Sequence, residues 1–313
     1  MSAADLSVAI GRLRLDNPVM VAAGTFGFGE EYAGLLDVDA LGALVTKGIS
    51  LQPRRGNPPP RTVETPAGML NSVGLENPGL ESFIENKMPW LRSLRTAVIV
   101  NIFGSTADEY AELAGRLDAV EGIAALEVNI SCPNVKRGGM AFGADPDIAR
   151  QVAKRVLDNT RLPVLVKLTP NVTDIAEVAK RVASSGVDGL TLINTLSGMA
   201  LDYRTGKPLL GNVIGGLSGP AIRPVAVRAV YEVARAVDIP LVGCGGICRW
   251  QDAVEFMRAG ATAVQVGSAT FRVPRTALEC LQGVDKFLTH GGYTSVSELV
   301  GHVESVTDKE SRA

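Results

Sequence analysis

The sequence predicts an α/β protein built as a closed (β/α)8 barrel. Short apolar segments recur eight times along the 313 residues, and each is followed by a segment with the spacing of an amphipathic helix. Hydrophobic residues make up 46% of the chain but aromatic residues only 5%, so its apolar content is mostly aliphatic. Aliphatic runs suit parallel strands that are buried on both faces. Eight alternations in a chain of this length favour a closed barrel over an open doubly wound sheet.

The expected strands are short aliphatic runs bounded by polar residues or glycine. They cover residues 19–23, 43–46, 98–102, 125–130, 164–168, 189–193, 241–243 and 263–266.

The expected helices lie between these strands and carry recognisable ends. Thr106 and Glu109 have the spacing of an N-terminal capping box, while Gly186 and Gly260 are typical helix stops. The helices are expected at residues 30–36, 80–94, 107–117, 145–158, 174–185, 221–236, 250–259 and 275–288.

Three further segments complete a single domain over residues 1–313. Residues 6–15 read as a hairpin around Gly11, which could plug the bottom of the barrel. Residues 48–78 and 196–219 are longer than ordinary connections, and both follow the carboxyl end of a strand. Active sites of (β/α)8 barrels, the TIM-barrel architecture, lie on that face, so we expect functional insertions there.

Other classes of protein are disfavoured. Gly24, Gly27 and Gly29 do not have the Gly-x-Gly-x-x-Gly spacing of a dinucleotide-binding domain, and there is no P-loop. A net charge of −2 disfavours nucleic acid as a partner. No apolar stretch reaches the roughly 18 residues of a membrane span, and no signal peptide is visible.

The four cysteines indicate a reducing environment. Cys132, Cys244, Cys248 and Cys280 form no Cys-x-x-Cys pair and have no zinc-like spacing with histidine, so no metal site is expected. Cys244 and Cys248 read as unpaired small residues in a glycine-rich turn. A cytoplasmic protein with free thiols fits this pattern.

Polar side chains stand at the carboxyl ends of several expected strands. Lys47, Asn101, Asn129, Lys167 and Asn194 each follow an aliphatic run. Residues inside the barrel should be apolar, so we expect these three amides and two lysines to converge on its mouth.

Glycines follow the last two expected strands. The Gly245-Gly246 pair and Gly267 allow backbone N–H groups to approach an anion closely, and Gly219 could add another. A phosphate there, with Lys167 beside a planar ring, suits FMN better than a sugar phosphate. A phosphosugar isomerase or lyase with Lys167 or Lys47 as a Schiff-base lysine remains open.

The most informative motif is Asn129-Ile-Ser-Cys-Pro-Asn134. It places two amides and a thiol where an expected strand ends, so the amides could hold a planar amide-rich ligand while Cys132 moves a proton.

Together with Asn71-Ser-Val-Gly-Leu-Glu-Asn-Pro-Gly79 and Thr46-Lys-Gly48, this motif resembles dihydroorotate dehydrogenase. The glycine turns and Asn194-Thr195 extend the resemblance over nearly the whole chain. Related FMN barrels that reduce pyrimidines or dihydrouridine in RNA share parts of the pattern, but usually lack the 71–75 element in this form.

The resemblance implies an oxidation of dihydroorotate to orotate in pyrimidine biosynthesis. Cys132 would act as the general base for the C5 proton, and FMN would accept the hydride from C6. The residues implied to bind substrate are Lys47, Asn71, Ser72, Val73, Gly74, Leu75, Asn129, Asn134, Asn194 and Thr195. The residues implied to bind FMN are Ala23, Lys47, Gly48, Asn101, Asn129, Lys167, Ile193, Gly219, Gly245, Gly246, Gly267 and Ser268.

The branches of this family differ in their electron acceptor. Quinone-linked members carry an N-terminal hydrophobic extension and a serine base, and this chain has neither. Lys136-Arg-Gly-Gly-Met-Ala-Phe-Gly143 and Asn77-Pro-Gly79 resemble the NAD-linked branch more than the fumarate-linked one. That branch implies an electron-transfer subunit with FAD and a 2Fe–2S cluster, in a heterotetramer around a homodimer core. The alternative is a homodimer that uses fumarate.

Overall fold

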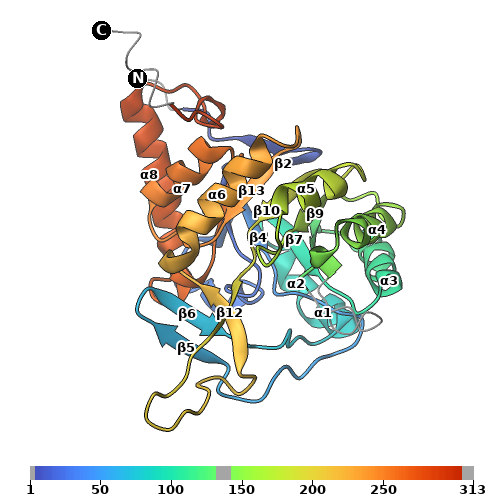
Figure 1. Ribbon diagram of the computed structural model, residues 1–313. Coiled ribbons are helices and arrows are strands. Elements are labelled where there is room, and N and C mark those ends of the chain that lie inside the picture. The colour runs from blue at the N-terminus through green and yellow to red at the C-terminus, as the bar shows by residue number, and fades with distance from the viewer. Residues whose placement is uncertain (1–3, 132–141, 305–313) are drawn as a thin grey trace.

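A computed structural model of the chain describes residues 4–131 and 142–304. Its centre is a closed barrel of eight parallel strands in the order β10-β13-β14-β3-β4-β7-β8-β9, which confirms the predicted (β/α)8 fold (Figure 1). The barrel strands are β3 (Val19–Val21), β4 (Ala43–Val45), β7 (Ala97–Ile102), β8 (Ala125–Asn129), β9 (Val164–Lys167), β10 (Gly189–Leu192), β13 (Leu241–Cys244) and β14 (Ala263–Val266).

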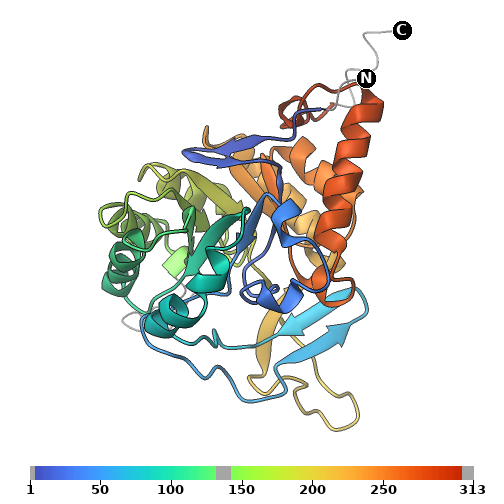
Figure 2. The same cartoon turned by 180° about the vertical axis from the view of Figure 1, so that it is seen from behind.

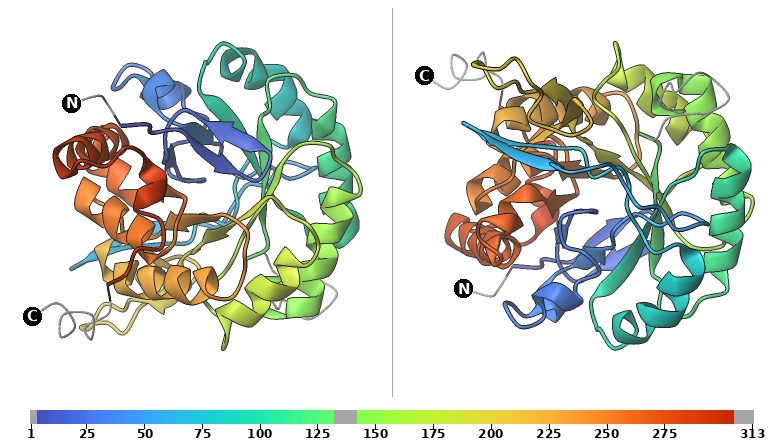
Figure 3. Two further views of the ribbon diagram at one scale, coloured as in Figure 1. Left: turned by 90° about the horizontal axis from the view of Figure 1, so that it is seen from above. Right: turned by 90° about the horizontal axis from the view of Figure 1, so that it is seen from below.

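Helices surround the barrel on its outer side (Figures 2 and 3). They are α1 (Leu80–Asn86), α2 (Met88–Leu91), α3 (Ala107–Asp118), α4 (Pro146–Leu157), α5 (Ile175–Ala183), α6 (Arg223–Ala234), α7 (Trp250–Ala259) and α8 (Thr276–Gly291). Short 3-10 turns lie at Glu30–Tyr32, Val38–Ala40, Phe142–Ala144, Pro220–Ile222, Ser268–Phe271 and Val296–Glu298.

Three details of the helix prediction were wrong. The helix expected over residues 80–94 breaks at Lys87 into α1 and α2, and the one expected over residues 30–36 is a 3-10 turn. The capping box of α3 is only half formed. Thr106 Oγ1 accepts from the Glu109 N–H, but the Glu109 carboxylate accepts from the Ser105 N–H at 2.7 Å, because residue 105 lies within its reach.

Strand residues alternate between two environments. Leu126 and Val128 of β8 point outward into the large core that the barrel shares with its helices. Ala125 points inward, where it joins Leu165 and Val242 in a small apolar cluster at the amino end of the barrel. This alternation sends every second residue toward the barrel axis.

The predicted hairpin closes the amino end of the barrel. It consists of β1 (Val8–Ile10) and β2 (Leu13–Leu15), which are antiparallel, and Ile10, Leu13 and Leu15 are buried in the inner cluster. Figure 3 shows it lying across the end of the barrel. Arg12 fixes its position through an ion pair at 2.8 Å with Asp188, the residue that precedes β10.

The two long excursions meet in one antiparallel sheet beyond the opposite end of the barrel (Figure 1). Its order is β11-β12-β6-β5, so β6 of the first excursion pairs with β12 of the second. Its strands are β5 (Thr62–Thr65), β6 (Gly68–Asn71), β11 (Leu196–Met199) and β12 (Ile214–Ser218).

None of the helices within residues 4–131 and 142–304 combines the length and the apolar character that crossing a membrane requires.

Candidate active site

Two adjoining compartments lie at the carboxyl ends of the barrel strands, beneath the four-stranded sheet. The larger has a volume of about 370 Å³, and the smaller, lined largely by the glycine turns, about 80 Å³. Lys167, Asn194 and Ser268 are among the residues that line both. Volumes of this order suit a small molecule or cofactor.

The structure brings together every predicted site residue that it describes. The larger compartment is lined by Ala23, Lys47, Gly48, Asn71, Ser72, Val73, Gly74, Leu75, Asn101, Asn129, Lys167, Asn194, Thr195 and Ser268. The smaller one adds Ile193, Gly219, Gly245, Gly246 and Gly267. Cys132 and Asn134 lie outside the described residues.

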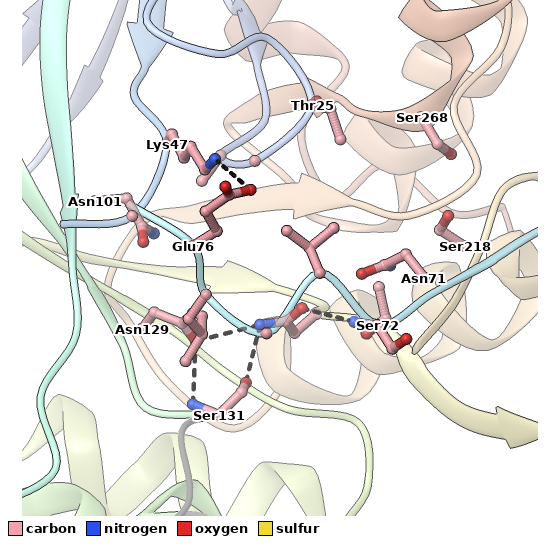
Figure 4. A pocket seen from close by; sticks show the side chains of 18 of the residues that line it. Thr25, Lys47, Asn71, Ser72, Glu76, Asn101, Asn129, Ser131, Ser218 and Ser268 are labelled. Carbon is pink, nitrogen blue, oxygen red and sulfur yellow. Dashed lines mark hydrogen bonds and ion pairs between the residues drawn. The ribbon is translucent and has the colours of Figure 1, made fainter. Parts of the chain in front are cut away.

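An amide cluster forms one wall of the larger compartment. Asn194 Nδ2 donates to Asn129 Oδ1 at 3.2 Å and to Ser131 Oγ at 2.9 Å. Asn129 Oδ1 also accepts from the Ser131 N–H, and Asn194 Oδ1 accepts from the Thr195 N–H. These bonds fix the orientation of both amides, as Figure 4 shows around Asn129 and Ser131.

The first excursion supplies the opposite wall. Asn71 Nδ2 donates to the Gly216 carbonyl at 3.2 Å, which ties β6 to β12. Ser72 Oγ is buried and has no hydrogen-bond partner among the described residues. A buried hydroxyl without a partner costs free energy unless a ligand satisfies it, so this atom is suited to a polar ligand group.

Lys47 brings a positive charge to the same cavity. Its ammonium lies 3.8 Å from Glu76 Oε2, and Glu76 also pairs with Arg61 at 2.8 Å. Figure 4 shows Lys47 and Glu76 facing each other. The Lys47 side chain is 30% exposed, so its charge remains available to an anionic ligand.

Lys167 approaches the cavity from below, in a buried polar layer inside the barrel. Its Nζ donates to Gln265 Oε1 at 3.0 Å and lies 3.8 Å from Glu127 Oε1. Glu127, Gln265 and Thr191 are all fully buried. The expectation that inward-facing strand residues would be apolar was therefore wrong at this level, because these polar groups hydrogen-bond to one another and so offset the cost of burial.

The charge state of Lys167 follows from its neighbours. Burial acts to lower the pKa of Lys167, but Cys244 once it is ionised, and the Glu127 carboxylate, act to raise it, and its pKa lies above the ordinary value. Burial raises the pKa of Cys244, which ends β13 beside it, so that thiol is neutral at neutral pH. Lys167 therefore presents a fixed ammonium to the cavity.

The smaller compartment is shaped by glycines. Gly219, Gly245 and Gly246 have φ values of 93°, 128° and 80°, a region that favours glycine. A Cβ on Gly246 would lie 2.8 Å from the Gly219 carbonyl oxygen and 3.0 Å from the Arg223 nitrogen, at the start of α6. The turn thus packs closely against the positive end of a helix, an arrangement that suits phosphate.

Sequence reasoning missed several residues of the site. Thr25, Glu76, Ser131, Ser218 and Phe271 line the larger compartment without having been assigned. Ser131 stands inside the motif that drew attention to the site, and Glu76 inside the second one, so motif position was the available signal for these two.

Comparisons with known proteins agree with one another. The family model described as dihydroorotate dehydrogenase matches residues 5–288. The chain is 57% identical over 297 residues to a protein of Desulforamulus reducens, covering 95% of this chain and 98% of that one. It is 55% identical over 300 residues to one of Pelobacter propionicus, covering 96% and 99%. It is also 53% identical over 304 residues to one of Citrifermentans bemidjiense, covering 97% and 100%. Each of these relatives is named dihydroorotate dehydrogenase B (NAD(+)), catalytic subunit.

Proposed function

The chain belongs to the dihydroorotate dehydrogenase family, and from this premise we propose that it oxidises dihydroorotate to orotate in pyrimidine biosynthesis. The observation that carries the proposal is the single cavity that holds the Asn129–Asn194 amide cluster, Lys47 and the buried ammonium of Lys167. Such a site offers hydrogen-bonding edges to a planar amide ring and positive charge to a carboxylate.

FMN fits the residues present. The glycine turns beside the start of α6 match a phosphate, and the ammonium of Lys167 matches the electron-rich side of a reduced flavin. We propose that FMN is held by the predicted set, with Gly245, Gly246, Gly267 and Ser268 at the phosphate and Lys167 at the ring. When bound, FMN supplies a hydride acceptor.

The chain's own residues then bind and orient the substrate. Asn71, Asn129, Asn194 and Thr195 present amide and hydroxyl groups to the orotate ring, and the backbone of residues 72–75 completes that wall. Lys47 balances the substrate carboxylate. Because the Asn129 and Asn194 side chains are already fixed by mutual hydrogen bonds, little ordering is needed when substrate binds.

Cys132 is the proposed general base, with Asn134 as a further substrate ligand. Its support is its place in the sequence, directly after Ser131, which lines the cavity. The thiolate takes the proton from C5 while the hydride leaves C6, which forms the C5=C6 double bond of orotate.

The phosphosugar alternative gains no support from the site. A Schiff-base lysine must lose its proton to act as a nucleophile. Lys167 is instead paired with Glu127 and has a raised pKa. Family membership also favours the flavin reaction.

NAD is the proposed final acceptor, reached through a partner. The relatives' name specifies NAD(+) and a catalytic subunit, which favours this branch over the fumarate-linked homodimer. We propose that a partner subunit with FAD and a 2Fe–2S cluster joins a homodimer of this chain in a heterotetramer. The free thiols of Cys244, Cys248 and Cys280 fit the cytoplasm as its location.

The first test is an absorbance spectrum of the purified chain, followed by anaerobic addition of dihydroorotate. We expect a yellow protein whose flavin band is bleached by the substrate. A flavin band that dihydroorotate leaves unchanged would contradict the substrate, and a protein that binds no FMN would contradict the cofactor. Reduction of NAD should require addition of the partner subunit.

A further inference from the structure

Beneath the larger cavity, one acidic and one basic side chain are buried together inside the barrel. The Glu127 side chain is 0% exposed and the Lys167 side chain 6% exposed, and their charged groups are 3.8 Å apart. They stand on adjacent strands, β8 and β9, which pair in parallel register. Charges are rarely buried to this degree unless they are paired.

The carboxylate of Glu127 is held from three sides. Its Oε1 accepts from Asn101 Nδ2 at 2.8 Å. Its Oε2 accepts from Gln265 Nε2 at 2.6 Å and from Thr191 Oγ1 at 2.9 Å. Gln265 in turn accepts from Lys167, so one amide bridges the two charges. Donors from β7, β10 and β14 therefore fix the carboxylate in place.

We propose that Glu127 is a positioning residue that acts through Lys167. Its carboxylate keeps the buried ammonium protonated and directed at the cavity, and it offsets part of that charge. In this way it sets how strongly the site stabilises a reduced flavin, and hence the cofactor's reduction potential. The part of the inference that concerns the potential rests on the proposed function, whereas the part that concerns the charge pair rests on the chain alone.

Within the described part of the chain, Glu127 is the group facing Lys167 that carries a negative charge near pH 7, because the other groups that face it are neutral. Gln265 of β14 is neutral. Cys244 of β13 has a pKa raised by burial, so it too is neutral near pH 7. Cys244 raises the pKa of Lys167 only once it is ionised, so near pH 7 burial would dominate without Glu127 and would lower that pKa below the unfolded value of about 10.4.

The first experiment needs no cofactor and measures stability against urea from about pH 6 to about pH 10. Lys167 then has a lower pKa in the folded Glu127→Gln variant than in the unfolded one. Between these two pKa values the folded state binds fewer protons than the unfolded state, so the stability of the variant rises with pH. We therefore expect the free energy of unfolding of Glu127→Gln to lie below that of the wild type, with a difference that is largest at the acidic end and shrinks as pH rises.

Two variants serve as controls. Thr191→Val removes a neutral hydrogen bond to the same carboxylate, and its deficit should not change with pH. The double variant Glu127→Gln/Lys167→Met removes both charges and should lose the pH dependence. A loss of stability in Glu127→Gln that is constant with pH would overturn the charge-pair part of the proposal. The same pH dependence in the double variant would overturn it as well.

The second experiment measures the midpoint potential of bound FMN at the acidic end of that series, where Lys167 of the variant is protonated. Glu127→Gln should favour the reduced flavin at least tenfold, or about 30 mV for a two-electron couple. Thr191→Val should leave the potential unchanged. An unchanged potential in Glu127→Gln would overturn the inference on tuning. A protein that takes up no FMN would instead contradict the proposed function, and the urea series would still decide the charge pair.

Discussion

At the scale of single residues, the proposed reaction depends on one proton acceptor, Cys132. A positioned base contributes about 10²–10⁴-fold to a proton transfer. Cys132→Ala should therefore bind FMN normally, while dihydroorotate reduces the flavin slower by that factor. Cys132→Ser should keep slight activity that increases with pH, because a hydroxyl is a poorer base. Anaerobic stopped-flow absorbance measures both rates.

A second thiol provides the matched control for this prediction. Cys280 is buried in α8, and burial raises its pKa to about 12, so it is inert at neutral pH. Cys280→Ala should reduce its flavin at the wild-type rate. Reduction of Cys132→Ala at that same rate would show that another group takes the proton.

The sequence was informative about residues at the carboxyl ends of the strands. It was misleading about the inward-facing residues that precede these ends inside the barrel. Parallel strands bring their carboxyl ends to one edge, so Asn101, Asn129 and Lys167 could be placed together without knowledge of contacts. Glu127 was missed because the barrel interior was expected to be apolar. Strand alternation carried the signal, since Glu127 is two residues before Asn129 and so faces the same side.

At the scale of elements, each strand and helix follows from local apolar spacing, but the sheet over the site does not. Strands β6 and β12 pair Asn71 with Gly216, which are 145 residues apart in the chain. Neither excursion has the length or core of an independent sheet, so each gains its register from the other. Local patterns hold no information on such a pairing, and it was therefore predicted only as two insertions.

The glycine turn after β13 gives a prediction at this scale. Gly246→Ala would place a Cβ 2.8 Å from the Gly219 carbonyl oxygen, so the turn must shift against α6. A shift that loses one backbone hydrogen bond to phosphate should weaken FMN binding roughly tenfold. Gly186→Ala is the control, because Gly186 also has a positive φ, of 92°, but has open space around it. Titration of the apoprotein with FMN measures the difference, and equal affinities in the two variants would contradict the proposed phosphate site.

The hairpin at the amino end of the barrel gives a second prediction at the scale of elements, which concerns stability in acid. Burial acts to raise the pKa of Asp188, but hydrogen bonds from Arg12 and from the Val164 N–H act more strongly to lower it. The pKa of Asp188 therefore lies below its ordinary value. The group therefore stabilises the fold above its unfolded pKa of about 3.9, and this contribution is lost as pH falls through the folded pKa.

Asp188→Asn should consequently destabilise the protein by about 2 kcal/mol at pH 7 and by progressively less on acidification below about pH 4. Asp158→Asn, which removes an exposed pair with Lys154, should cost less than about 1 kcal/mol. Urea unfolding at several pH values measures both. A cost of Asp188→Asn that does not diminish in acid would show that the charge of Asp188 is not what holds the hairpin.

At the scale of the whole molecule, the barrel and the sheet above it should unfold together. Leu196 and Leu217 of that sheet pack against the core that the barrel shares with its helices, and the site draws residues from both parts. A single calorimetric transition is therefore expected for residues 1–313, with equal calorimetric and van't Hoff enthalpies. FMN at 100 times its dissociation constant should stabilise that transition by about 2.7 kcal/mol, because it binds the folded chain alone. Two separate transitions, or one that FMN shifts while another stays in place, would show that the excursions form a unit of their own and that the site is assembled between two independently folding parts.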